Sequence, residues 1–305
     1  MSTRTRLNLV LGVVLATLLT ALWLWPAAPA PETQTRVPLP VDTSVETVAR
    51  IEIQRPAAAP VQLSRRSDGW WLTRPFEYPA NATHIARLLS ILDVPARPLE
   101  PASRTTSISM RDRGDESAPV ADDPLGLDPP ALARLGFDDI VLDLGARTPL
   151  GLQRYVRLGD RLYVIEDRWR TLLQGPLQQF CSSELLGDMR GLSAASLHAP
   201  DTTDANTDDR GSALPAAKLT ELEARLRAAK AFTVRAAGEV RAAPLARLRL
   251  TNAQGSTLLT LRSTGQSLVV ERDNPPLAHH FTATAGQELI DDLNALFFAR
   301  SPSGQ

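Results

Sequence analysis

Histidine and cysteine side chains offer the most diagnostic chemistry in this sequence, yet their spacing forms no recognisable cluster. The chain contains four histidines and one cysteine, Cys181. Structural zinc sites combine several such ligands at short fixed spacings, and no such spacing occurs. His279 and His280 are adjacent, and adjacent residues of a strand point to opposite faces, so they are poorly placed to bind one metal ion. We predict no metal or other cofactor, and we interpret the pair as polar residues of an edge strand.

The remaining residues of this kind have ordinary structural interpretations. Cys181 has no histidine nearby in the sequence and no local positive charge that would activate a thiol, so we expect a small buried residue near a helix end. His84 stands near the start of a predicted helix and is expected to be exposed. His198 is expected to border a loop.

An acidic stretch before residue 211 partly matches the calcium-binding loop of EF-hand proteins. Asp204, Asn206 and Asp208 match its first, third and fifth ligand positions. The sixth position holds Asp209 where glycine is required, and the twelfth holds Pro215 where a bidentate glutamate is required. The stretch is therefore expected to be a solvated linker.

Three pairs of neighbouring carboxylates could in principle supply general acid and base groups. The pairs are Asp122-Asp123, Asp138-Asp139 and Asp291-Asp292. Sequence neighbours rarely converge on one reaction centre. We therefore interpret the first two pairs as turn or strand-entry residues and the last pair as part of the solvent-exposed face of a helix. Glycine-rich phosphate loops and the G-x-S-x-G nucleophile motif are absent from the sequence. We therefore expect no enzymatic activity.

Aromatic residues are the best candidates for contact with a ligand or a partner. Trp70 and Trp71 are consecutive, so on a strand one ring should enter the core while the other stays partly exposed. The exposed ring could bind a carbohydrate, although a packing role is an equally good interpretation. Tyr155 and Tyr163 are the other two candidates for lining a ligand pocket.

The chain begins with the features of a membrane anchor. Residues 7–25 carry no charge and would span a bilayer of roughly 30 Å as a helix. Arg4 and Arg6 precede the run, which keeps residues 1–6 cytoplasmic and sends the rest across. A cleaved signal peptide ending near 28–30 is the alternative. Either interpretation places the bulk of the chain outside the cytoplasm, in the periplasm of a bacterium whose inner membrane it crosses once.

Beyond the anchor, the pattern predicts an α+β fold of repeated β-β-β-α units, with helices packed on antiparallel sheets. A Pro/Ala-rich spacer at 26–44 leads into the first unit. The expected units are 45–100, 125–198 and 217–305, separated by a polar insert at 101–124 and an acidic linker at 199–216. The formal net charge of -1 argues against a nucleic-acid partner.

Alternating apolar residues and helical periodicity place the elements of each unit. The expected strands are 48–53, 61–63 and 70–74, then 139–144, 153–158 and 161–165, and finally 246–250, 257–261 and 267–270. The expected helices are 82–92, 169–177, 217–229 and 285–298, of which the second is interrupted by Gly175-Pro176. Asp68-Gly69 and Gly159-Asp160 are expected to form hairpin turns.

Several of these segments together resemble a bacterial family known as domain of unknown function 4340. The similarity is carried by "RIEIQRP", "VQLSRRSDGWWLTRP", "LGLDPPA" at 125–131 and "RTPLGLQRYVRLGDRLYVIED" at 147–167. The insert at 101–123 departs from the family pattern. The resemblance implies a membrane-anchored companion of ABC transporters of the gliding-motility type, with no catalytic residues to transfer.

These observations favour a non-enzymatic accessory protein that docks on a transporter or another envelope complex. The alternative is a protein that binds an envelope glycan or lipid. A hydrolase would need a convergent nucleophile or metal cluster, which the sequence does not suggest.

Overall fold

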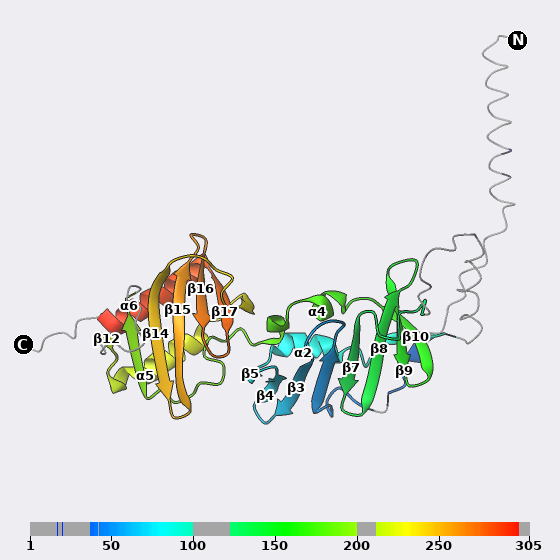
Figure 1. The fold of residues 1–305 in the computed structure, drawn as a ribbon, viewed down its shortest axis with the longest axis horizontal. Coiled ribbons are helices and arrows are strands. Elements are labelled where there is room, and N and C mark those ends of the chain that lie inside the picture. Colours follow the sequence, from blue (N-terminus) through cyan, green and yellow to red (C-terminus); the bar gives the residue numbers. More distant parts are fainter. Residues whose placement is uncertain are drawn as a thin grey trace, which may run out of the picture. The chain divides into compact units, whose positions relative to one another are not determined.

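The computed structural model describes Thr17, Thr20 and residues 37–41, 43–99, 123–199 and 212–298. It shows a mostly-β protein with two antiparallel sheets and few helices (Figure 1). The residues from Pro38 onward cluster into one compact unit. The antiparallel sheets predicted from the sequence are therefore confirmed.

Ten strands of the described chain form the first sheet. In spatial order they are β1 (Val37–Pro38), β6 (Pro95–Pro98), β10 (Arg161–Glu166), β9 (Gln153–Leu158), β8 (Ile140–Arg147), β7 (Ala133–Phe137), β2 (Arg50–Gln54), β3 (Val61–Arg66), β4 (Gly69–Arg74) and β5 (Tyr78–Pro79). The first two predicted units meet where β2 pairs with β7, so they share one sheet.

Tight turns hold the hairpins of this sheet in register. Gly159 has a φ of 56° in the two-residue turn between β9 and β10, a conformation that glycine adopts without steric cost. Asp138 has a φ of 50° in the turn between β7 and β8. Its carboxylate accepts the backbone N–H groups of Ala49 and Arg50 at 3.0 and 2.8 Å, which ties the turn to β2.

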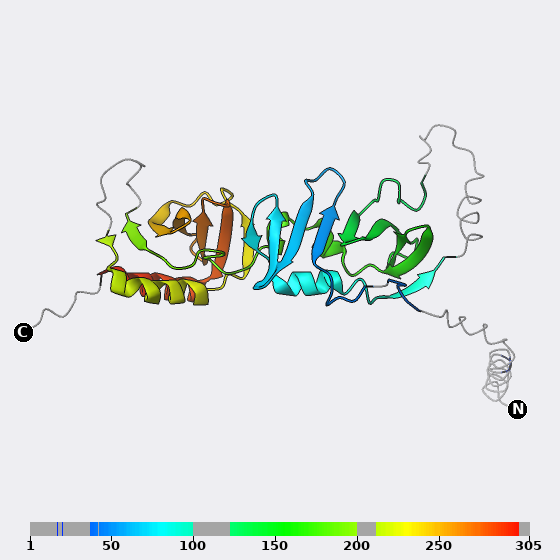
Figure 2. The ribbon, with the colours of Figure 1, turned by 90° about the horizontal axis from the view of Figure 1, so that it is seen from below.

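Helix α2 (Ala82–Leu89) begins at Asn81, whose side-chain oxygen accepts the N–H groups of Thr83 and His84. The helix buries Ile85, Leu88 and Leu89 in the core of the first sheet. Figure 2 shows the helix, in cyan, lying along one side of the blue strands of that sheet. Burying one such side chain stabilises the fold by about 1.5–3 kcal/mol. Helix α4 (Arg170–Gln174) and the 3-10 helix η2 (Leu177–Phe180) follow β10.

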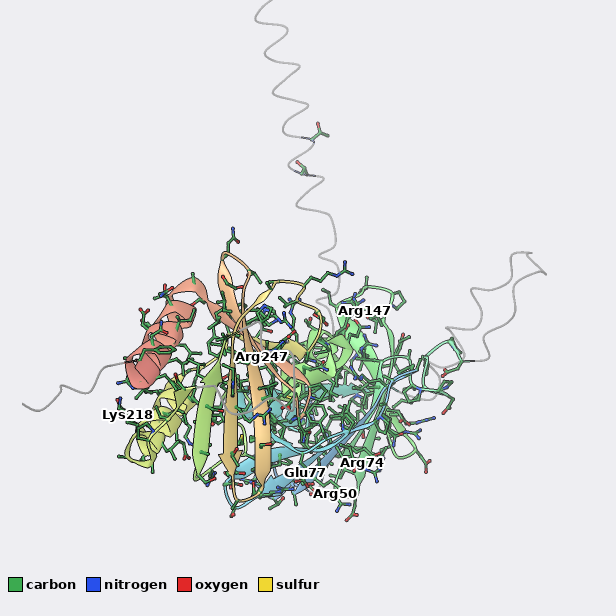
Figure 3. All side chains as sticks on the ribbon, turned by 60° about the vertical axis from the view of Figure 1, so that its left-hand side comes forward. Arg50, Arg74, Glu77, Arg147, Lys218 and Arg247 are labelled. Carbon is green, nitrogen blue, oxygen red and sulfur yellow. The ribbon has the colours of Figure 1, made fainter. Side chains whose placement is uncertain are left out.

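Seven strands of the described residues form the second sheet. In spatial order they are β12 (Ser212–Ala213), β11 (Ala194–His198), β14 (Pro244–Asn252), β15 (Gly255–Ser263), β16 (Ser267–Arg272), β17 (Leu277–Thr282) and β13 (Thr233–Ala236). Helices α5 (Ala216–Ala228) and α6 (Ala283–Phe298) lie side by side along it (Figure 2). Lys218 of α5, labelled in Figure 3, donates to the backbone oxygen of Leu296 of α6 at 3.0 Å.

Two buried apolar clusters form the cores, one for each sheet. The second sheet also contributes to the core of the first, because Val234 and Leu277 are buried within the first cluster. Close packing leaves little spare volume in the second core. A Cβ atom added at Gly286 of α6 would approach the Cβ of Leu268 to 2.5 Å.

Most predicted elements are confirmed, and the interpretation of one pair of residues is wrong. His279 and His280 lie on β17, which has β16 on one side and β13 on the other, so they are not on an edge strand. Strands β1, β5, β6, β7, β11, β12 and β13 were not predicted, and β17 was expected only through its two histidines, without bounds. The helix at 169–177 is divided into α4 and η2 at Gly175 and Pro176, so the interruption predicted there is confirmed.

The predicted cytoplasmic tail and transmembrane segment, residues 1–25, lie outside the described residues apart from Thr17 and Thr20. The spacer at 26–44 and the two polar inserts also lie largely outside them. Among the helices of the described part of the chain, none combines the length and apolar character needed to cross a bilayer.

Candidate functional site

Trp70 and Trp71 are neighbours on β4 and make different kinds of contact. Trp70 packs against the first core, while the ring of Trp71 is fixed by polar contacts. The indole N–H of Trp71 donates to Asp68 at 2.8 Å, and the guanidinium of Arg66 lies 4.5 Å from the ring centroid. Both side chains are half-buried. Trp71 is partly exposed as expected, whereas Trp70 packs against the core without being fully buried.

A polar pocket of about 420 Å³ opens beside these tryptophans. Residues from two distant regions of the sequence, 68–83 and 182–230, line it, and polar atoms make up most of its walls. The lining residues are Asp68, Gly69, Trp70, Trp71, Pro79, Ala80, Asn81, Ala82, Thr83, Ser182, Ser183, Glu184, Gly187, Arg190, Arg227 and Lys230. The volume suits a small ligand.

The charged groups of the pocket are loosely paired at its rim. Arg190 contacts Asp68 at 3.2 Å, and Lys230 lies 3.8 Å from Glu184. Arg227 is held by Glu223, which lies outside the lining, at 3.0 Å. The lining therefore carries three cations, Arg190, Arg227 and Lys230, against two carboxylates, Asp68 and Glu184.

Behind the pocket, Gly187 lies against a buried polar junction. Its φ of +59° and its contact with Tyr78 both require glycine, because an added Cβ would approach the ring to 2.5 Å. The Tyr78 hydroxyl donates to the backbone oxygen of Glu184 at 2.8 Å and lies 3.1 Å from Nε2 of His279. Since the hydroxyl has one proton and the carbonyl only accepts, we assign the ring proton of His279 to Nε2. Arg272 lies over the Tyr78 ring at 5.4 Å.

Burial and neighbouring charge perturb both titratable groups of this junction. Burial raises the pKa of Tyr78 well above its ordinary value. Burial and the positive charge of Arg272 lower the pKa of His279 to about 3, so the imidazole is neutral at physiological pH. Nδ1 of His279 has no hydrogen-bond partner among the described residues.

Tyr155 and Tyr163, the other two candidate contact residues, lie elsewhere on the first sheet. Tyr155 is half-buried on β9, and Tyr163 is buried on β10. Tyr163 lines a separate pocket of about 550 Å³ together with Val41, Ile140 and Leu158. In the strand order, β8, β7, β2 and β3 separate them from Trp71 on β4. The structure therefore does not bring the four aromatic residues into one site.

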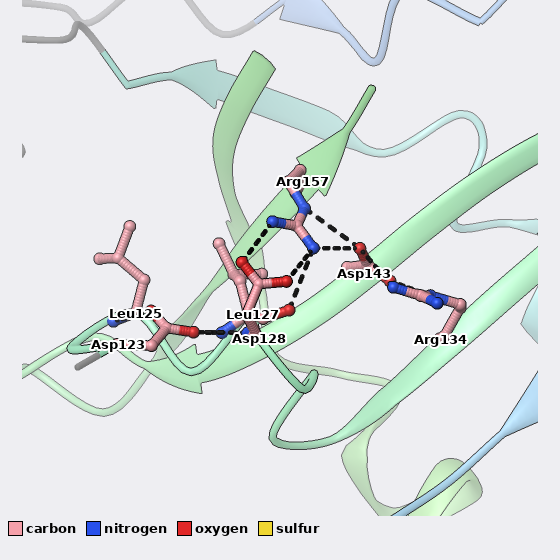
Figure 4. Close-up of polar contacts among 7 residues, drawn as sticks. All are labelled: Asp123, Leu125, Leu127, Asp128, Arg134, Asp143 and Arg157. Carbon is pink, nitrogen blue, oxygen red and sulfur yellow. Dashed lines mark hydrogen bonds and ion pairs between the residues drawn. The ribbon is translucent and has the colours of Figure 1, made fainter. Parts of the chain in front are cut away.

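A network of arginines and carboxylates holds the segment that leads into β7 (Figure 4). Asp143 accepts from Nε of Arg134 at 2.6 Å and from Nη2 of Arg157 at 2.7 Å. Arg157 also bonds Asp128 at 2.7 Å, and Asp123 accepts backbone N–H groups of that segment, including that of Leu125 at 3.0 Å. Burial opposes ionisation of Asp143, but the hydrogen bonds from both arginines lower its pKa below the ordinary value. A carboxylate held ionised in this way is suited to structural pairing and poorly suited to act as a general acid.

The remaining candidate side chains have local partners. Nδ1 of His84 lies 2.7 Å from the backbone oxygen of Gln179. This histidine is half-buried, so the prediction that it is exposed is wrong. His198 ends β11 and contacts the hydroxyl of Ser196 at 2.9 Å. Cys181 is buried, and burial raises the pKa of its thiol to about 12.

Within the described residues, no group of three or more histidine, cysteine, aspartate or glutamate side chains could hold a metal ion. The described arrangement is suited to binding a polar ligand. Comparisons with protein-family models, with curated proteins and with solved structures found no match. The family resemblance drawn from the sequence therefore stays a prediction.

Sequence reasoning missed most of the pocket. Arg190, Arg227 and Lys230 carry no motif, and the segments that bear them gave no sign of meeting Trp71. Lys230 had one weak signal, because the chain contains only two lysines. Tyr78 likewise stands in a short segment that showed no strand pattern.

Proposed function

We propose that this chain is a non-enzymatic, membrane-anchored accessory protein that presents its β-sheet body outside the cytoplasm and docks on an envelope complex. The proposed partner is the membrane part of an ABC-type transporter. The uncharged run at 7–25 and the resemblance quoted above support this proposal. The proposed location is the bacterial inner membrane, crossed once, with most of the chain in the periplasm.

The observation that carries the docking proposal is the loop between β8 and β9. Leu150 and Leu152 are 90% and 78% exposed there, and both are large apolar side chains. Exposed apolar residues that stand together on a loop are typical of contact surfaces. A membrane-embedded subunit offers apolar surface to such a loop, and an anchored protein is held close to it.

Charged pairs fix the base of this loop. Asp167 accepts from Nε of Arg147 at 2.6 Å and from Nε of Arg154 at 2.8 Å, and Asp167 and Arg154 are nearly inaccessible to solvent. Arg147 is labelled in Figure 3. The N–H of Thr148 donates to the backbone oxygen of Gln153 at 2.9 Å across the loop. A preorganised loop loses less conformational entropy on binding, which favours docking by the two leucines.

The test is affinity purification of the C-terminally tagged full chain from native membranes in mild detergent, followed by mass spectrometry. We expect an ABC ATPase and permease to be recovered, and at least tenfold less of both with Leu150→Ser/Leu152→Ser. Leu245→Ser is the control, because it removes a leucine that is 47% exposed on β14. Equal recovery with both variants would exclude the loop as the docking site. A chain that is purified alone, even after crosslinking, would overturn the accessory function.

We also infer that the sheets are built from repeated units of antiparallel strands followed by a helix. Four strands precede a helix in each case, one more than in the expected β-β-β-α unit: β2 to β5 before α2, then β7 to β10 before α4. In the second sheet, β14 to β17 precede α6 in the same way. This regularity supports the repeat and is consistent with the family resemblance.

The second candidate function is the binding of an envelope glycan or lipid. The pocket beside Trp71 is the specific observation that favours it. Its walls are mostly polar, so a saccharide fits them better than an acyl chain would.

A further inference from the structure

We propose that the pocket beside Trp71 binds a small saccharide that carries a carboxylate. This inference rests on the second candidate function and names the class of ligand. The pocket volume of about 420 Å³ matches a ligand of one or two sugar rings.

The cations of the pocket favour a negatively charged ligand. Within the described residues, Arg227 donates through Nη2 to Glu223 at 3.0 Å and to the backbone oxygen of Met189 at 2.7 Å. Its remaining guanidinium N–H groups can donate to a ligand, and a carboxylate matches the geometry of that group. The side chain of Lys230 is 64% exposed and 3.8 Å from Glu184, so the pair is weak enough to exchange for a ligand.

Trp71 provides apolar surface for a sugar ring on the face that Arg66, which does not line the pocket, leaves uncovered. The contacts with Asp68 and Arg66 hold the indole in one orientation, so binding costs little side-chain entropy. An aromatic ring with a polar edge contacts the C–H face of a sugar while leaving its hydroxyl groups in polar surroundings. A simple inorganic anion would gain nothing from this ring.

The other lining groups include both donors and acceptors, as a ligand rich in hydroxyl groups requires. Ser183 and Thr83 provide hydroxyls, and Asp68 and Glu184 provide acceptors. The first turn of α2, which begins at Ala82, also lines the pocket. The partial positive charge of a helix N-terminus adds to the attraction for a carboxylate.

The experiment measures binding to the full chain in mild detergent micelles by ligand-detected nuclear magnetic resonance. The acidic probes are glucuronate, galacturonate and N-acetylmuramate, and the neutral probes are glucose, galactose and N-acetylglucosamine. Acetate and inorganic phosphate are tested at the same ionic strength. We expect at least one acidic saccharide to bind at least fivefold more tightly than its neutral counterpart and than either simple anion.

Variants then assign the site. Trp71→Leu and Lys230→Gln should each weaken binding of that acidic saccharide at least fivefold. Arg74→Gln is the matched control, because Arg74 ends β4 outside the pocket and its loss should leave binding unchanged. Trp71→Phe keeps an aromatic ring in case the leucine variant fails to fold, and a smaller loss of affinity is expected from it.

Three results would overturn the proposal. Equal binding of acidic and neutral saccharides, lost in Trp71→Leu, would exclude the acidic class while preserving ligand binding as a function. Binding of all anions alike, unchanged in Trp71→Leu, would show an unspecific charge effect. No binding of any saccharide would remove the glycan function altogether, and the docking function would remain open to its own separate test.

Discussion

The hydroxyl of Tyr78 lies 3.1 Å from Nε2 of His279, although 201 positions separate the two residues in the sequence. Tyr78 belongs to β5 at one edge of the first sheet, and His279 belongs to β17 of the second. The backbone oxygen of Glu184 accepts the hydroxyl proton at 2.8 Å, so the segment between the sheets takes part in the same contact. This buried junction links the two sheets and lies directly behind Gly187 of the pocket.

Replacing Tyr78 with phenylalanine should destabilise the fold without changing its packed volume much. The substitution leaves a buried carbonyl and the ring N–H of His279 without their partner, which costs about 1–3 kcal/mol for each such group. Urea unfolding of the full chain in detergent measures this loss. Tyr155→Phe is the control, since Tyr155 is only half-buried and lies outside the junction. Equal midpoints for the two variants would contradict a stabilising role of the Tyr78 hydroxyl.

The junction should also make the protein sensitive to mild acid. The folded protein holds His279 with a pKa of about 3, whereas the unfolded chain titrates this group near 6.5. Between these values the unfolded state binds more protons, so stability falls as the pH is lowered through this range. From pH 7.5 to 5, His279 alone should reduce the free energy of unfolding by about 2 kcal/mol.

His279→Gln tests this assignment, because glutamine retains a hydrogen-bonding group toward Tyr78 and does not titrate. The variant should show a shallower loss of stability between pH 7.5 and 5 than the original chain. Burial also lowers the pKa of His280, so that neighbour adds to the remaining slope in both proteins. Identical slopes for both proteins would show that His279 does not cause the acid sensitivity.

Strand patterns bounded by clear turns were predictable from the sequence, whereas short strands were not. β9 was predicted with its observed bounds, because alternating residues lead directly into the Gly159 turn. β7 was missed although its burial alternates regularly, because Gly136 weakens its strand propensity and Asp138, a non-glycine residue with positive φ, closes its hairpin. β12 has only two residues, too few for any periodic signal.

The candidate pocket was predictable only at its tryptophans. Because successive side chains of a strand point to opposite faces, the sequence predicted different surroundings for the two rings, and Trp70 packs against the core while Trp71 makes polar contacts. The cations come from segments more than 100 positions away, and the contact of Arg190 with Asp68 spans 122 positions. Contacts of that kind depend on how the two sheets are joined, which no local pattern in one sequence reveals.

Asp143→Asn should weaken the arginine network of the first sheet. Asp143 is 6% exposed and accepts from both Arg134 and Arg157, so the change removes the ionised acceptor of two charged donors. We expect a loss of about 1–3 kcal/mol in the free energy of unfolding. The exposed turn residue Asp139 offers the matched control, because Asp139→Asn should change stability by less than about 0.5 kcal/mol. If Asp143→Asn lowered the free energy of unfolding by no more than Asp139→Asn does, the arginine network would contribute nothing measurable to stability.

Cys181 should resist alkylation in the folded protein. Burial raises the pKa of its thiol to about 12, so the reactive thiolate is scarce and inaccessible at pH 8. As the chain has one cysteine, intact-mass spectrometry after iodoacetamide treatment reports this site alone. We expect rapid modification in urea and almost none without it. Rapid modification of the native protein would show that the segment around Cys181 opens readily.

Val234 and Leu277 place apolar side chains of the second sheet inside the hydrophobic cluster of the first. Removing the second sheet would therefore expose part of the first core to water, and isolated halves would each lose buried apolar area. The two sheets are thermodynamically coupled, so heating should produce one cooperative heat-absorption peak for them. As an evolutionary consequence, neither sheet could be exchanged between proteins as an independent module without redesign of its boundary.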